Sequence, residues 1–131
     1  NHANLKSADF AYAKIVTLCA GKNFDAAKAT LESYKPIFAK SEGWGMLALI
    51  CSSLASKEFN PEGMHRDYAL KSLQETREKA KEDWQALLQV ALGFRIAGER
   101  EQFVECFEQA MDICPEKAAK AALKQQFEML R

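Results

Sequence analysis

The chain has 131 residues, of which 48% are hydrophobic and 27% charged, the composition of a single globular domain. Its 18 basic and 18 acidic residues cancel, so neither nucleic acid nor an anionic membrane surface is the expected partner. No apolar run approaches the roughly 20 residues that a membrane-spanning helix needs.

Apolar residues recur at three- and four-residue steps along most of the chain, which is typical of amphipathic helices. The alternating apolar and polar runs that indicate strands are nearly absent. The sequence therefore predicts an all-α fold of seven helices, at about 5–20, 24–39, 42–57, 61–80, 84–97, 100–113 and 116–131.

Several helix boundaries carry specific signals. Ser41 and Asp83 can each cap a helix, because their side-chain oxygens accept from a backbone N–H of the first turn. Asn60-Pro61 gives the clearest helix start, with a capping asparagine before a proline at the first helical position. Gly98 is expected to end the fifth helix.

Residues with catalytic or metal-binding chemistry are few and scattered. The two histidines, His2 and His65, form no pair, and His65 is expected to be solvated or to act as a cap. No C-x-x-C spacing occurs among the cysteines, so we expect all four to be reduced, in a reducing compartment such as the cytoplasm: Cys19, Cys51, Cys106 and Cys114. We predict no catalytic residue, no metal and no cofactor.

One helical hairpin has an ordered series of large, small and aromatic residues, at Leu87, Val90, Ala91, Phe94, Gly98, Phe103, Phe107, Ala110 and Pro115. This order resembles the tetratricopeptide repeat (TPR) pattern. The slot of Leu87 recurs at Ala11, Trp44 and Ala121, with successive spacings of 33, 43 and 34 residues. Two spacings match the family's period of about 34 residues, and the long one fits an insertion near 56–64.

The resemblance implies a TPR-like α-α superhelix that forms a single domain. Its parts would be three helical hairpins, at about 5–39, 42–80 and 84–113, and a capping helix at 116–131. Near the start of the 42–57 helix, Gly45 is expected to let another chain approach closely.

In the TPR family, the first helix of each hairpin lines a concave groove. The corresponding residues, called here the groove set, are Asp9, Tyr12, Val16, Met46, Leu49, Gln85, Leu88, Gln89, Leu92 and Arg95. This lining is apolar with few charges, so the resemblance implies a non-catalytic adaptor or scaffold that binds a peptide or partner helix. Capture of a chaperone's C-terminal carboxylate is not expected, because the matching slots lack the paired cations of that clamp.

Three alternatives stay open at the level of sequence. The chain could be a structural segment of a larger protein, with Leu49 and Leu88 covered by the remainder. It could also self-associate through its end faces, for example as a homodimer. An enzyme subunit is the third alternative, and a carboxylate with a raised pKa in a cleft would favour it.

Overall fold

The computed structural model describes residues 2–40 and 43–131, so the predicted cap Ser41 lies outside the described residues. Seven α-helices and one 3-10 helix (η1) occur, and the described ranges contain no strand, which confirms the all-α class. The elements are α1 (His2–Ala20), α2 (Phe24–Tyr34), η1 (Lys35–Ala39), α3 (Trp44–Ala55), α4 (Arg66–Lys79), α5 (Trp84–Ile96), α6 (Arg100–Ile113) and α7 (Lys117–Leu130).

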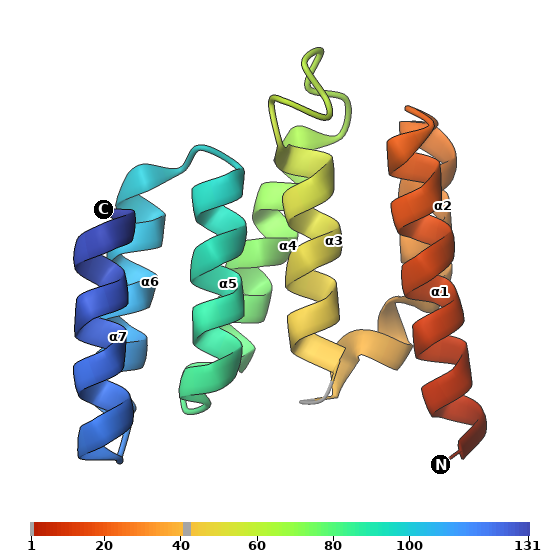
Figure 1. Cartoon of the computed structure of the whole chain (residues 1–131). Coiled ribbons are helices and arrows are strands. Elements are labelled where there is room, and N and C mark those ends of the chain that lie inside the picture. Colours follow the sequence, from red (N-terminus) through yellow and green to blue (C-terminus); the bar gives the residue numbers. More distant parts are fainter. Residues whose placement is uncertain (1, 41–42) are drawn as a thin grey trace.

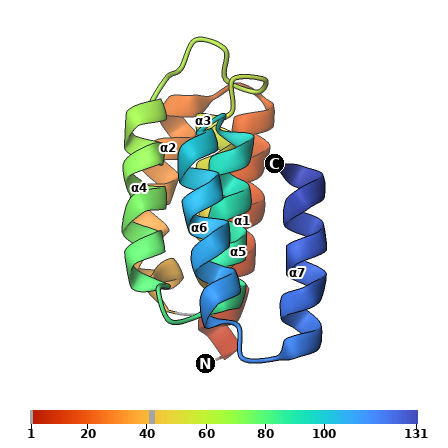
Figure 2. The same ribbon diagram turned by 90° about the vertical axis from the view of Figure 1, so that its left-hand side faces the viewer.

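The helices form antiparallel hairpins that stand side by side, so that the first helices make one layer and the second helices another (Figure 1). Hairpin 1 is α1–α2, hairpin 2 is α3–α4 and hairpin 3 is α5–α6, and in each the two helices pack directly on one another. The first helices α1, α3 and α5 lie in one layer, with α3 packed against both α1 and α5. The last helix, α7, packs on α6 and stands on the opposite side of the molecule from α4 (Figure 2).

Hairpin 3 has a fully buried core, and aromatic rings connect it to α7. Leu87, Val90 and Phe94 of α5 are fully buried, as their helical spacing predicts. The rings of Phe103 and Phe107 on α6 lie 6.0 and 5.2 Å, centroid to centroid, from the ring of Phe127 on α7. This aromatic cluster holds the terminal helix on the stack.

Local signals account for three helix boundaries, of which two were predicted and one was missed. The Asp83 carboxylate accepts from the Ala86 N–H at 3.1 Å, which confirms the predicted cap of α5. Gly98 has a φ of 83°, the left-handed conformation that ends a helix, and α5 stops two residues before it. The predicted 24–39 helix is divided, because Pro36 lacks an N–H and α2 gives way to η1 after Tyr34.

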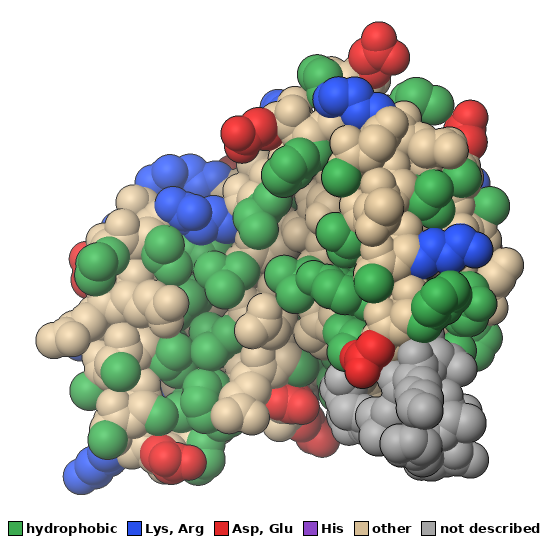
Figure 3. Space-filling model, turned by 45° about the vertical axis from the view of Figure 1, so that its right-hand side comes forward, with side chains coloured by type: hydrophobic (Ala, Val, Ile, Leu, Met, Phe, Trp, Pro, Cys, Tyr) green, Lys and Arg blue, Asp and Glu red, His purple; other side chains and the backbone are tan. Residues whose placement is uncertain are grey.

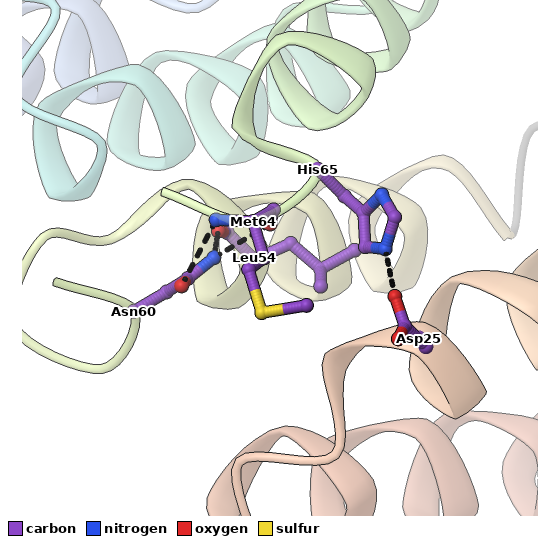
Figure 4. Close-up of polar contacts among 5 residues, drawn as sticks. All are labelled: Asp25, Leu54, Asn60, Met64 and His65. Atoms are coloured by element: carbon purple, nitrogen blue, oxygen red, sulfur yellow. Dashed lines mark hydrogen bonds and ion pairs between the residues drawn. The ribbon is translucent and has the colours of Figure 1, made fainter. Parts of the chain in front are cut away.

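The predicted start of the fourth helix at Asn60-Pro61 is wrong, since α4 begins at Arg66. The Asn60 side chain, which is buried, donates instead to the carbonyls of Leu54 at 2.9 Å and Met64 at 2.7 Å (Figure 4). Its Oδ1 accepts from the Met64 N–H at 3.2 Å. The asparagine therefore organises a loop after α3 rather than capping α4.

Within the described chain, no close approach occurs at Gly45. A Cβ at Gly45 would lie 3.6 Å from Gln89 Cγ, an ordinary contact. A Cβ at Gly43 would lie 2.7 Å from the Cα of Phe38, so the glycine lets η1 pass close to the start of α3.

Candidate binding surface

Charged residues are distributed very unevenly between the two layers of helices. Among its 12 residues α3 has no charged side chain, and among its 13 residues α5 has only Arg95. The helices behind them are highly charged, with seven charged residues in α4 and five in α6, each helix having 14 residues. The face formed by α1, α3 and α5, called here the inner face, is therefore nearly uncharged at its centre.

The groove set belongs to α1, α3 and α5, the helices of this inner face, and none of its ten residues is buried. Six apolar or aromatic members are half-buried, namely Tyr12, Val16, Met46, Leu49, Leu88 and Leu92. The four polar members, Asp9, Gln85, Gln89 and Arg95, are exposed. Figure 3 shows hydrophobic side chains gathered across the middle of this face.

The members of the groove set come from three helices that pack as neighbours in the order α1, α3, α5. Where α3 meets α5, Gly45 has no side chain, and its backbone lies beside Gln89. Half-buried apolar residues of adjacent helices therefore share one continuous face.

A pocket at one end of this face was not predicted from the sequence. It has a volume of about 480 Å³ and lies where the end of α5, the start of α6 and the end of α7 meet. Its lining residues are Arg95, Gly98, Arg100, Phe103 and Leu130. The Nε of Arg95 donates to the Leu130 carbonyl at 3.3 Å, which ties α5 to the end of α7.

The sequence reveals only part of this pocket, because its lining comes from three helices. Arg95 was predicted to end the groove set, and its helical position can be read from the sequence. Arg100, Phe103 and Leu130 join it only through the way α6 and α7 pack, which no local signal encodes.

The described residues contain no obvious reactive centre. All four cysteines are buried and free. Burial raises the pKa of the Cys19 and Cys106 thiols to about 11 and that of Cys51 to about 12, which disfavours the nucleophilic thiolate. His65 contacts Asp25, with 2.6 Å between Nε2 and Oδ1 (Figure 4).

In the described part of the chain, no group of three or more histidine, cysteine or acidic residues is placed to hold a metal ion. Nor does any described helix have the length and apolar character to cross a membrane.

Comparisons with known proteins identify no relative. No family model matches the chain, and neither a curated protein nor a solved structure matches it.

Proposed function

We propose that this chain is a TPR-like helical repeat that serves as a non-catalytic protein-interaction module. Its ligand is a peptide or helix of a partner protein, held on the inner face. The observation that carries this proposal is the combination of six half-buried apolar residues with the near absence of charge on α3 and α5.

The packing of hairpin 3 supports the repeat part of the proposal. The slots that define the family pattern in α5 and α6 contain fully or almost fully buried residues, among them Leu87, Phe94, Phe107 and Ala110. In addition, α5 packs against both helices of the preceding hairpin, α3 and α4. Such contacts are those of a stack in which each hairpin completes the core of its neighbour.

The surface properties support the binding part. An apolar side chain that is half-exposed gains free energy when a partner covers it, and charges at the centre of such a surface would oppose that burial. A peptide with two or three apolar anchors fits the spacing of apolar positions over adjacent helices. The exposed amides of Gln85 and Gln89 offer hydrogen bonds to the main chain of such a peptide.

Selection from a phage library of random peptides on the immobilised protein tests this function. We expect enrichment of peptides with several apolar residues, and loss of their binding by at least about tenfold in Leu49→Arg/Leu88→Arg. Because both leucines are half-buried, circular dichroism must show that this variant is folded. A second variant, Gln85→Glu/Gln89→Glu, changes only exposed side chains and adds charge to the same face.

The matched control places two carboxylates on the other layer, at the exposed positions Ser33 of α2 and Gln74 of α4. Ser33→Glu/Gln74→Glu should bind the selected peptides as the parent does. Peptides that bind the inner-face variants and the parent equally would place the binding surface elsewhere. A selection that enriches no peptide would contradict the proposed function.

A further inference from the structure

We propose that the pocket at the end of α5 binds a side-chain carboxylate of the partner. The module would then select peptides in which apolar residues are accompanied, at one end, by aspartate or glutamate. This inference rests on the function proposed above and specifies the chemistry of its ligand.

The pocket is continuous with the inner face through Arg95. This residue is the only charged side chain of α5, belongs to the groove set and also lines the pocket. A peptide that covers Leu88 and Leu92 and continues towards the C-terminal end of α5 therefore reaches the pocket.

The two arginines of the pocket carry charge that the described residues do not neutralise. Arg95 makes one hydrogen bond, to the Leu130 carbonyl, and Arg100 makes no hydrogen bond or ion pair within the described ranges. Two carboxylates close by in the sequence form ion pairs with other cations, Glu99 with Arg66 at 3.5 Å and Glu128 with Arg131 at 3.6 Å. The pocket is thus lined by two arginines, neither of which forms an ion pair with a described residue.

The remaining lining favours a carboxylate over a fully hydrated ion. Leu130 and the small exposed part of Phe103 form an apolar wall of the pocket, whose exposed lining is otherwise polar. Charge-assisted hydrogen bonds are stronger beside such a wall, because less water competes for the donors. A guanidinium presents its N–H groups in a plane that matches the two oxygens of a carboxylate.

The experiment combines the peptide library with removal of the two cations. The parent and Arg95→Gln/Arg100→Gln are each used for selection, and the fraction of aspartate and glutamate in the enriched peptides is compared. Selected peptides are then synthesised with a C-terminal amide, so that side chains are their only carboxylates. Each is paired with a version in which the acid is replaced by asparagine or glutamine, and affinities are measured by fluorescence anisotropy.

On the parent, we expect acidic peptides to be enriched and the acid-to-amide change to weaken binding by about five- to tenfold. On Arg95→Gln/Arg100→Gln, the enrichment and the difference between the paired peptides should both disappear. The control Lys71→Gln/Lys79→Gln removes two exposed cations from α4 and should retain both effects. Raising the salt concentration should weaken the acidic peptide more than its amide partner.

The outcomes separate this inference from the function on which it rests. Peptides that need Leu49 and Leu88 but show no preference for acids would overturn the carboxylate pocket and leave the interaction module intact. An acid preference that survives Arg95→Gln/Arg100→Gln would also overturn the pocket. Binding that is indifferent to Leu49 and Leu88 would contradict the proposed function itself, whatever the preference for acids.

Discussion

Gly93 lies at a junction where three helices leave no room for a side chain. A Cβ there would lie 3.0 Å from the Cδ2 of Leu73 on α4 and 3.3 Å from the carbonyl oxygen of Ala48 on α3. Leu73 and Ala48 are fully buried, so neither can move aside freely. The glycine therefore allows α5 to pack closely on hairpin 2.

Gly93→Ala and Gly45→Ala are matched changes with opposite expected effects. Replacing a helical glycine by alanine stabilises by about 0.5–1 kcal/mol, because the unfolded chain loses freedom. At Gly45 the new methyl group makes an ordinary contact, so we expect a gain of about 0.5 kcal/mol. At Gly93 overpacking should outweigh the gain, for a net loss of about 1 kcal/mol. Urea unfolding followed by circular dichroism measures both, and equal shifts would show that the junction adapts.

Cys51 makes stability depend on pH in the alkaline range. Burial raises the pKa of its thiol to about 12 from an ordinary value of 9.0. Since the pKa in the folded state is above that in the unfolded state, the thiol's contribution is complete below pH 9 and is lost as pH rises from 9 towards 12. The free energy of unfolding should therefore fall by up to about 1.4 kcal/mol per pH unit from this group.

The pH dependence of Cys51→Ala isolates this effect, because the other titrating groups are present in both proteins. Denaturant unfolding between about pH 8 and pH 10 should show a shallower decline for Cys51→Ala than for the parent. The smaller side chain lowers stability at every pH, so the slope and not the absolute value is the readout. Parallel pH profiles for the two proteins would show that the thiol ionises as easily in the folded state as in the unfolded one.

At the scale of helices, the Arg66 side chain links the C-terminal ends of α3 and α5. Arg66, at the start of α4, donates from Nε to the carbonyl of Ala55 at 3.2 Å and from Nη2 to that of Ala97 at 2.6 Å. Ala55 is the last residue of α3, and Ala97 follows the last residue of α5. The arginine thereby satisfies C-terminal carbonyls of adjacent first helices.

Arg66→Met should destabilise the protein by about 2 kcal/mol, because two carbonyls lose a charged donor. Arg66→Lys should recover only part of the loss, since an ammonium cannot reproduce the two-sided geometry of a guanidinium. Arg100→Met is the control, because Arg100 is exposed and makes no hydrogen bond within the described ranges. If Arg66→Lys is as stable as the parent in thermal unfolding, the positive charge and not the guanidinium geometry stabilises the protein at this position.

The helices whose boundaries could be predicted from sequence are those decided by their nearest neighbours. Asp83 caps α5 through an N–H three residues along, and Gly98 ends the same helix through its own φ. Asn60 carried an equally strong local signal, but its side chain bonds to the carbonyl of Leu54, on the preceding helix. A capping residue with two competing partners cannot be assigned from sequence alone.

The candidate surface likewise has one part that could be named before the structure and one part that could not. The resemblance to the TPR pattern named Leu49, Leu88 and the rest of the groove set, and the structure shows that none of these residues is buried. The pocket could not be named, because Phe103 and Leu130 meet only through the packing of α7 on α6. Likewise space is limited at Gly43 and Gly93 rather than at Gly45, a difference set by contacts with other elements of the fold.

At the scale of the whole molecule, the stack has a centre and two ends. The central helix α5 is covered by α3, α4 and α6, whereas α1 is covered mainly by α2, η1 and α3. In a helical-repeat array such as the one proposed above, stability is the sum of each unit and its neighbour contacts, so end units open at lower free energy than central ones.

Native-state hydrogen exchange measures this gradient and connects it to binding. We expect the slowest amides in α5 and α3, and exchange faster by at least about tenfold in α1. The inner face spans both regions, with Tyr12 and Val16 on α1 and Leu88 on α5. A peptide that covers the whole face must hold α1 against the stack, so it should slow exchange in α1 more than in α5. Equal slowing in all helices would mean that the stack opens as one unit, and protection confined to α5 and α7 would restrict the ligand to the pocket end of the face.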